Sequence, residues 1–215
     1  MSSARDNILA RVRAALGRQA ADPAARSAAQ VHMAAHPIGP RPALPEDLRA
    51  RFLENALKLE SSTDELATRK DIPVAVARYL DRLGVDRRAA GWPEFADLDW
   101  AAAGVDLAIR PTQGLDPVGV TGVYCAIAET GTLVVLAGSE APSATLLLPD
   151  THIAVLSAGR IVGSMEEAFA LIRRERGQMP RAVNMISGPS RTGDIEQTIV
   201  LGAHGPFRVH LLILP

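Results

Sequence analysis

Cysteine is nearly absent from this sequence, which contains a single one, Cys125, among 215 residues. A single cysteine excludes an internal disulfide framework, and it excludes any iron–sulfur cluster or structural zinc site built from cysteines of this chain alone. We therefore expect no cofactor in this chain and a reducing, cytoplasmic environment. No basic residue adjoins Cys125 to favour its thiolate, so we predict that it is a small residue of the core.

An excess of one charge and long apolar runs are also missing. The net charge is −1, which gives no long-range field to gather phosphate backbones, so nucleic acid is not an expected partner. A membrane-spanning helix needs about 20 consecutive apolar residues, whereas apolar stretches such as LVVLAG at 133–138 are interrupted by glycine or charge. We expect a soluble protein without a membrane span.

Four common functional motifs are missing as well: G-x-G-x-x-G after a strand, G-x-x-x-x-G-K-[ST], G-x-S-x-G and H-E-x-x-H. Their absence argues against the usual dinucleotide, nucleotide, hydrolase and zinc protease sites. His204 lies in a glycine-flanked turn and His210 in an apolar segment, and no spacing supplies a third metal ligand beside them. We predict no metal site, and we expect His152 and His210 to be structural.

The first 45 residues differ in character from the rest. Four apolar residues recur at helical spacing before Gly17: Ile8, Leu9, Val12 and Leu16. This pattern predicts an amphipathic helix that packs on another surface, although the arginines and small residues around it would also suit a transit peptide. Residues 19–45 are rich in alanine and proline and predict a linker or extended arm. We expect residues 46–215 to form the folded domain.

The domain alternates predicted helices with apolar segments of strand length. Helical spacing and end signals predict helices at 46–59, 72–83 and 164–177. Strands are predicted at 105–111, 152–157, 182–187 and 208–214, and residues 122–138 read as a hairpin that turns at Gly131. Because most of these segments are almost entirely apolar, we predict an α/β sandwich with a mostly parallel sheet covered on both faces.

The segment after the strand at 182–187 is a candidate site for a small anion. Glycines there free backbone amides, hydroxyl groups add donors, and an arginine adds a fixed positive fork. The predicted ligand-binding residues are Ser187, Gly188, Ser190, Arg191 and Thr192, with His204 near the same edge. Since ligands bind at the carboxyl edge of open α/β sheets, we expect the pocket at that edge.

Alternatively, the same segment is purely structural. Ser190 or Thr192 would then cap a short helix near Asp194, and Arg191 would pair with Asp194 or Glu196 on the surface.

Glu129 interrupts an apolar run just before the hairpin turn. A carboxylate against apolar walls must be partnered, protonated or functional, so Glu129 is a candidate catalytic acid, base or nucleophile. Thr130 and Thr132 would orient it, and Gly131 would allow the turn. We expect this bend and the loop after Ser187 to converge at one edge of the sheet and to face a shared open cavity, so Thr130, Gly131 and Thr132 are also predicted ligand-binding residues. The competing interpretation is a hairpin tip with Glu129 facing solvent.

Four segments together closely resemble the lactate-utilisation protein C family, also called the LUD-domain family: GVYCAIAETGTLVVLAG (122–138), LLLPDTHIAVLSAGRIVGSMEEAFALI (146–172), MISGPSRTGDIEQTIVLGAHGP (185–206) and VHLLIL (209–214). The opening ARDNILARVRAAL (4–16) is also similar to that family's first helix. The resemblance implies a three-layer α/β/α fold similar to the sugar-phosphate isomerase (NagB/RpiA) and coenzyme A transferase group.

The same resemblance implies a role in oxidising L-lactate to pyruvate, as the subunit without clusters in an assembly whose partner subunits carry iron–sulfur clusters. It assigns no catalytic residue in this chain, so the roles of Glu129 and Arg191 rest on chemistry alone. The alternative is a stand-alone transferase or isomerase that uses Glu129 on a phosphate or acyl substrate.

Overall fold

The computed structural model describes residues 3–17, 22–193 and 198–215, which form two compact units, residues 1–42 and 43–215. In the first unit, helix α1 (Ala4–Ala15) begins with a capping box between Ser3 and Asp6. The predicted helix is therefore confirmed. Its apolar side chains Ile8 and Val12 are 61% and 49% exposed, so the surface on which it would pack remains a prediction.

The segment predicted to be a linker or extended arm contains a helix, α2 (Pro23–Ala35), so the extended conformation is wrong for these residues. The Asp22 carboxylate accepts the amide of Ala25, and Pro23 occupies the first turn, where its missing N–H costs nothing. Alanine has the highest helix propensity, and this outweighs the absence of a large apolar face.

The second unit contains the predicted helices and one short addition: α3 (Leu48–Lys58), α4 (Ile72–Leu83), α5 (Ala144–Leu147) and α6 (Met165–Arg176). Helix α4 starts with Pro73 in its first turn and ends at Gly84 in the left-handed conformation. Helix α6 starts at Ser164, whose hydroxyl accepts the amide of Glu167. Short 3-10 turns lie at Arg69–Asp71, Pro93–Phe95 and Ala158–Arg160. No helix in the described part of the chain is long and apolar enough to cross a membrane.

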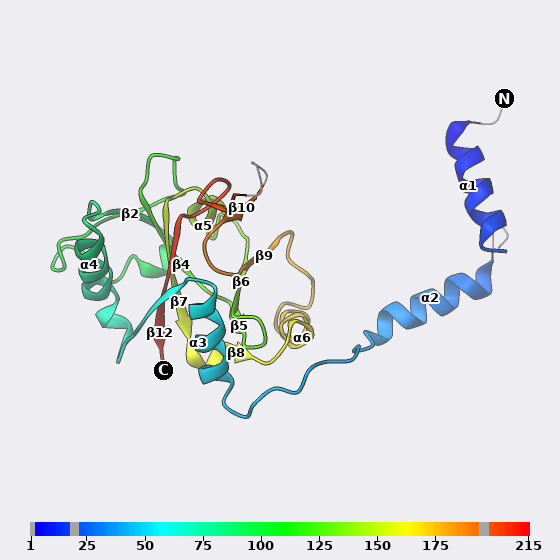
Figure 1. The fold of residues 1–215 in the computed structure, drawn as a ribbon, viewed down its shortest axis with the longest axis horizontal. Helices are drawn as coiled ribbons and strands as arrows, with labels where there is room; N and C mark the ends of the chain where they lie inside the picture. Colours follow the sequence, from blue (N-terminus) through cyan, green and yellow to red (C-terminus); the bar gives the residue numbers. More distant parts are fainter. Residues whose placement is uncertain (1–2, 18–21, 194–197) are drawn as a thin grey trace. The chain divides into compact units, whose positions relative to one another are not determined.

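The central sheet has six strands in the order β1-β12-β7-β4-β2-β3, and all neighbouring pairs are parallel (Figure 1). The strands are β1 (Ser62–Glu65), β2 (Arg88–Gly91), β3 (Asp106–Ile109), β4 (Val118–Gly122), β7 (Thr151–Ser157) and β12 (Arg208–Leu214). The central strands β7 and β12 are almost wholly buried, as expected for a sheet covered on both faces.

A second sheet of four strands has the order β8-β5-β6-β9, with β5 (Cys125–Ile127), β6 (Thr132–Leu136), β8 (Ile161–Val162) and β9 (Val183–Ile186). The predicted hairpin is confirmed, because β5 and β6 pair antiparallel and Gly131 has φ +68°. Strand β9 pairs antiparallel with β6, so it lies outside the parallel sheet.

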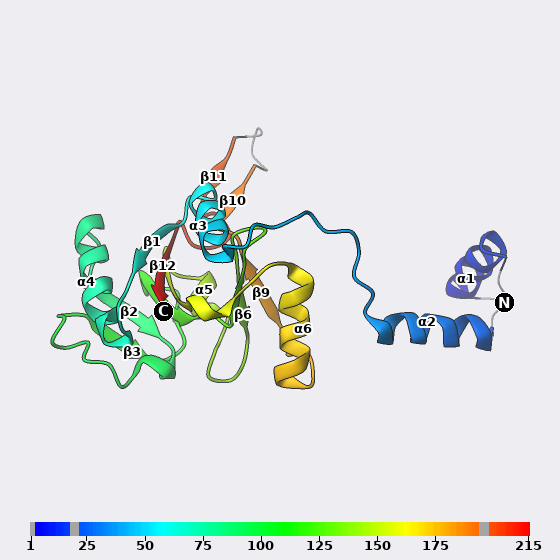
Figure 2. The ribbon, with the colours of Figure 1, turned by 90° about the horizontal axis from the view of Figure 1, so that it is seen from below.

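A third, two-stranded ribbon projects from the body of this unit (Figure 2). It pairs β10 (Arg191–Thr192) with β11 (Val200–Leu201). The short helix predicted near Asp194 falls outside the described residues. So do Asp194 and Glu196, the two acids predicted as partners of Arg191.

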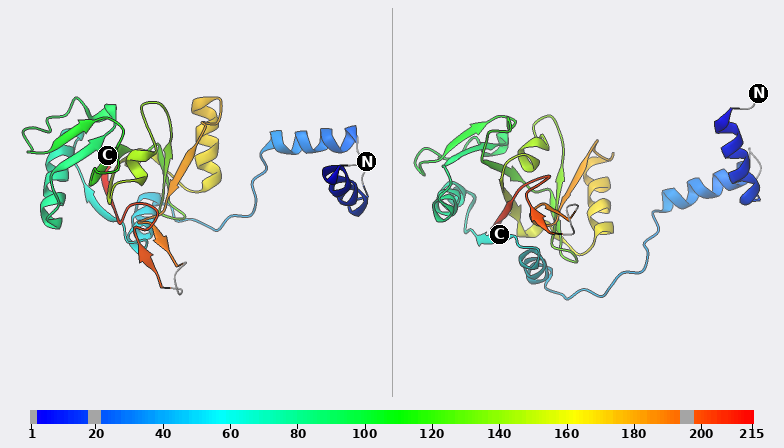
Figure 3. Two further views of the ribbon diagram at one scale, coloured as in Figure 1. Left: turned by 90° about the horizontal axis from the view of Figure 1, so that it is seen from above. Right: turned by 45° about the horizontal axis from the view of Figure 1, so that its top comes forward.

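Three apolar clusters fill the second unit and define its layers. Helix α4 packs on one face of the central sheet with Val120 and Ile153, and α3 packs on the other face with Leu156 and Leu211. The inner face of the second sheet joins the α3 cluster, and its outer face packs on α6 through Ile172. Figure 3 shows α4 and α6 on opposite sides of the strands. The predicted α/β/α sandwich with a mostly parallel central sheet is confirmed, and the small second sheet is an addition to it.

Two histidines and the cysteine are core residues. His152 Nε2 lies 2.8 Å from Thr121 Oγ1, and His210 Nδ1 lies 2.8 Å from Ser62 Oγ. Burial lowers the pKa of each imidazole to about 4, so both rings are neutral at pH 7. Burial also raises the pKa of the Cys125 thiol to about 11, which makes it unreactive. The structural roles predicted for these three residues are confirmed.

Candidate functional site

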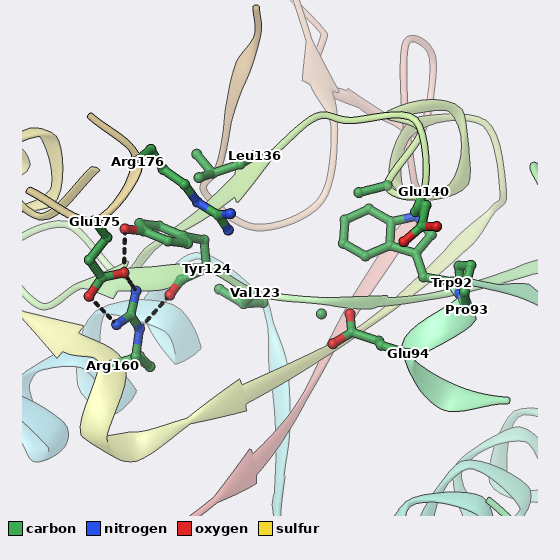
Figure 4. A pocket seen from close by; sticks show the side chains of 12 residues that line it. Trp92, Pro93, Glu94, Val123, Tyr124, Leu136, Glu140, Arg160, Glu175 and Arg176 are labelled. Atoms are coloured by element: carbon green, nitrogen blue, oxygen red, sulfur yellow. Dashed lines mark hydrogen bonds and ion pairs between the residues drawn. The ribbon is translucent and has the colours of Figure 1, made fainter. Parts of the chain in front are cut away.

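A cleft of about 450 Å³ opens where the central strands β2 and β4 end. Its walls come from residues that directly follow these strands, from the turn after β7 and from the end of α6, and they include Trp92, Glu94, Val123, Tyr124, Arg160 and Arg176 (Figure 4). The cleft therefore lies at the carboxyl edge of the parallel sheet.

The order of the strands explains why space is left at this point. After β2 the next strand of the central sheet is β3 on one side, whereas after β4 the chain passes through β5, β6 and α5 and returns as β7 on the other side, so the two connections diverge between β2 and β4. Open α/β sheets bind their ligands at such a topological switch point. We therefore take this cleft as the candidate functional site.

A rigid polar cluster forms one wall of the cleft. Both terminal nitrogens of Arg160 donate to the Glu175 carboxylate at 2.8 Å, and Arg160 Nε donates to the Tyr124 carbonyl at 2.8 Å. The Tyr124 hydroxyl donates to the same carboxylate at 2.7 Å. The Arg160 and Tyr124 hydrogen bonds lower the pKa of Glu175 to about 2, so this carboxylate stays ionised and occupies Arg160.

Arg176 is the cation that this cluster leaves available. Its guanidinium carbon lies 5.5 Å from the centre of the Tyr124 ring, and the side chain is exposed. Within the described part of the chain, Arg176 forms no ion pair. A planar guanidinium that is held on an aromatic ring and has open donors suits a carboxylate or phosphate ligand.

The opposite wall carries two carboxyl groups, Glu94 and Glu140. Burial raises the pKa of Glu94, and the amide of Gly122 donates to its carboxylate and partly offsets this effect. Gly122 has no side chain, and a Cβ there would collide with Glu94 Oε1. Glycine at this strand end therefore makes room for the carboxyl group, which lies in the cleft although much of the Glu94 side chain is exposed.

A second cavity of about 490 Å³ shares Leu136, Glu140, Ala141 and Arg176 with the first. The two form adjacent lobes with Arg176 at their common boundary. In the first lobe, Trp92 is 7% exposed, and its indole nitrogen is buried without a hydrogen-bond partner in the described structure. Among the described residues, no group of three His, Cys, Asp or Glu side chains is arranged to hold a metal ion.

The site residues predicted from the sequence lie elsewhere, and none of them lines these two cavities. The Ser187–Thr192 segment lies beside residues that lead into strands β1 and β12, since the Ser190 amide donates to Pro206 and Arg191 donates to the Leu59 carbonyl. That is the amino edge of the central sheet. The expectation that this segment lies at the carboxyl edge is wrong, because β9 belongs to the second, antiparallel sheet.

The two predicted bends do meet. Thr130 Oγ1 lies 2.7 Å from Thr132 Oγ1, which lies 2.8 Å from Ser187 Oγ and so forms a chain of three hydroxyl groups. Glycines let both bends press against helix α3: a Cβ on Gly131 would be 2.6 Å from the Ala56 amide nitrogen, and one on Gly188 would collide with the Leu59 carbonyl. This arrangement fastens α3 to the second sheet.

The three predicted site residues with charged or titratable side chains are Arg191, Glu129 and His204. Arg191 forms an ion pair with Glu60 at 2.9 Å, which is the kind of surface pairing expected in the structural alternative, with a different acid. Glu129 is half-buried on the hairpin turn, and its backbone carbonyl accepts from Asn55 Nδ2 at 2.9 Å. His204 is exposed in the turn before β12, at the amino edge and not the carboxyl edge expected for it. Whether any of these residues binds a ligand stays a prediction.

Sequence reasoning missed the residues that line the cleft. Strand β2 reads RAAG, which is too short and too poor in large apolar residues to be recognised as a strand. The WPE segment that follows it therefore carried no sign that it lies at the end of a strand. The available signal was Gly122, a glycine at the end of the segment 118–122 that lies two residues before Tyr124.

The family model of the LUD domain matches residues 71–214, a range that contains all the cleft residues described above. The chain belongs to the LUD-domain family. The prediction of family membership is thus confirmed, and the cleft lies within the LUD domain.

Curated relatives of the chain carry the name lactate utilization protein C. The protein from Bacillus licheniformis is 33% identical over 129 residues, which cover 57% of this chain and 53% of that protein. The protein from an Exiguobacterium species is 32% identical over 134 residues, which cover 60% of this chain and 58% of that protein. The chain thus spans about half the length of the curated relatives that it matches.

A solved structure shares the fold. The crystal structure of a DUF162 family protein from Deinococcus radiodurans superposes with a TM-score of 0.58 and 21% sequence identity. The match covers 81% of this chain and 100% of that one. At this identity the likeness establishes the fold alone.

Proposed function

We propose that this LUD-domain protein takes part in lactate utilisation, as the subunit without clusters in a cytoplasmic assembly that oxidises L-lactate to pyruvate. The observation that carries the proposal is the LUD-domain match over residues 71–214, together with the name shared by its curated relatives. Oxidation of lactate releases two electrons and two protons for each pyruvate formed. Since the single cysteine of this chain is buried, the proposal assigns the iron–sulfur clusters that accept these electrons to partner subunits.

Within such an assembly, the switch-point cleft is the proposed site of a small anionic ligand. Arg176 would bind the acid group, because Arg160 is already held by Glu175. This moves the anion site away from the Ser187–Thr192 segment but keeps it at the carboxyl edge of the sheet. The stand-alone transferase or isomerase that would use Glu129 remains an untested alternative, and full activity of a Glu129→Gln variant would remove it.

Growth of the source organism tests the proposal. Deleting the gene should abolish growth on L-lactate as sole carbon source and leave growth on pyruvate intact, and the wild-type gene should restore growth on lactate. Normal growth of the deletion strain on lactate would contradict the proposal.

A pull-down tests the assembly. The tagged full chain, isolated under anaerobic conditions from lactate-grown cells, should bring down proteins that contain iron and acid-labile sulfide. Recovery of the chain alone from cells that oxidise lactate would refute the proposed partnership.

A further inference from the structure

The cleft has more room than a lactate or pyruvate molecule would fill. Its two lobes measure about 450 and about 490 Å³ and share four lining residues. Pockets of roughly 300–1,000 Å³ hold ligands of drug size, whereas lactate has only a few non-hydrogen atoms. The dimensions therefore favour a larger ligand.

The cationic groups of the cleft lie at one end, where Glu175 is paired with Arg160, and its two remaining carboxyl groups lie at the other end. Figure 4 shows Arg176 on the side of Tyr124 and Glu175, and it shows Glu94 and Glu140 beside Trp92 on the other side. A simple monoanion would pair with Arg176 and make no contact with Glu94 or Glu140 at the other end. A ligand that spans the cleft should therefore be positive or donor-rich at its far end.

Glu94 gives the strongest reason for a donor at that end. Its carboxyl group lies against Gly122, and the resulting burial raises its pKa. Although the side chain as a whole is exposed, its carboxylate is partly desolvated, and an ammonium or N–H donor on a ligand would add a second partner to the Gly122 amide. A side chain on residue 122 would displace the Glu94 carboxyl group from this position.

The surface between the two ends is apolar and partly aromatic, with Trp92, Val123 and Leu136 along it. The indole N–H of Trp92 is a buried donor without a partner in the described structure, which is an unusual feature that calls for an explanation.

We propose that the cleft binds a bipolar organic anion, with its acid group at Arg176 and an ammonium or N–H donor group between Glu94 and Glu140. An apolar or aromatic body would lie against Trp92 and Val123. This inference rests on the proposed anion site at Arg176. Amino acids and nucleotides both have this chemistry, so the two sources are separate arms of the test.

Isothermal titration calorimetry on the full chain compares pairs of probes that differ in the donor end. In the amino acid arm, L-phenylalanine is compared with 3-phenylpropionate, which lacks only the ammonium group. In the nucleotide arm, adenosine 5′-monophosphate is compared with ribose 5-phosphate, which lacks the base. In one arm, we expect the bipolar probe to bind about 10- to 100-fold more tightly than its partner and than L-lactate.

Variants connect the binding to the named groups. Arg176→Gln should weaken the bipolar probe about 10-fold or more, whereas Arg174→Gln on the same helix, whose side chain does not line the cleft, should not change it. Glu94→Gln should weaken the bipolar probe and leave its monopolar partner unchanged. Circular dichroism confirms that each variant is folded.

Equal binding within both pairs of probes would overturn the inference, and so would tight binding that Arg176→Gln leaves unchanged. The proposed role in lactate utilisation would survive either result, because it is judged by growth on lactate and not by these probes. Conversely, bipolar binding in a protein whose deletion leaves growth on lactate normal would support the inference and refute the proposed role.

Discussion

The two edges of the central sheet are built in opposite ways. At the amino edge, the Glu129–Thr132 turn and the Ser187–Arg191 loop press their backbones against α3, and their hydroxyl groups bond to one another. At the carboxyl edge, the residues that follow β2 and β4 diverge and leave a cleft, which adjoins a second cavity formed by the segments at the ends of β6 and α6. Residues that look functional in a sequence can therefore serve packing, while the open site is formed by segments with no recognisable motif.

Acidification should change the stability of the protein more than any substitution below. The reason is that two buried neutral histidines lie at the amino edge, near the amino ends of β7 and β12. Their folded pKa values of about 4 lie below the ordinary 6.5, so unfolding below pH 6.5 takes up protons. Stability is fully present above pH 6.5 and is lost as the pH falls toward 4. We expect the free energy of unfolding to drop by roughly 2 kcal/mol per histidine between about pH 7 and about pH 5.

Urea unfolding at the two pH values measures this drop. His210→Gln should remove about half of it, because the desolvated ring of His210, which faces Asp64 and Arg82, would no longer titrate. An unfolding free energy that is level over this range would show that the histidines are not buried as described.

Gly188→Ala should have the next largest effect. Gly188 has φ +78°, and a Cβ there would collide with the Leu59 carbonyl, so we expect a loss of about 3 kcal/mol. The matched change Gly138→Ala, at a glycine that lines the second lobe and has nothing within 4 Å of the added Cβ, should cost less than about 0.5 kcal/mol. Equal costs in urea unfolding would contradict the contrast between a tight edge and an open one.

Asn55→Ala tests the fastening of α3. The Asn55 side-chain amide donates to the carbonyls of Ala128 and Glu129, both at 2.9 Å, and its loss should cost about 2 kcal/mol. Lys58→Ala, on the exposed side of the same helix, should cost less than about 0.5 kcal/mol. Thermal unfolding of the two variants gives the comparison, and a stable Asn55→Ala protein would mean that α3 is held by apolar packing alone.

Arg176→Gln should have the smallest effect on stability. The side chain is exposed, and within the described residues its one cation–π contact is with the Tyr124 ring, so we expect a change within about 0.5 kcal/mol. Arg160→Gln, which breaks the bonds to Glu175 and to the Tyr124 carbonyl, should cost more. A large loss for Arg176→Gln in urea unfolding would identify it as a structural residue and weaken its assignment to a ligand.

Much of the fold was predictable because its long elements carry local signals. Pro73 and Gly84 bracket α4, Ser164 and Gly177 bracket α6, and the apolar runs of β7 and β12 mark buried strands. Helix α2 was missed because alanine favours helix without producing an apolar stripe. Strand β1 reads STDE and lies at the edge of the sheet, so it lacks the apolar pattern of the central strands.

The candidate site was predictable only in part. The general rule for open α/β sheets predicts a pocket at the carboxyl edge, and the structure has a cleft there. Which segments reach that edge depends on strand pairing, and a local pattern does not show that β9 joins β6 and not the parallel sheet. The convergence of Thr132 with Ser187 was expected correctly, but the edge at which they meet was not.

The most direct test of where the ligand binds compares Arg176→Gln with Arg191→Gln in the deletion strain, at matched protein levels. The measurement is the initial rate of L-lactate oxidation in cell extracts. If the cleft is the site, Arg176→Gln should lower the rate about 10-fold or more, while Arg191→Gln, which breaks only a surface ion pair with Glu60 and one bond to a carbonyl, should keep nearly the full rate. A normal rate with Arg176→Gln and a lost rate with Arg191→Gln would contradict the account and return the site to the loop at the amino edge.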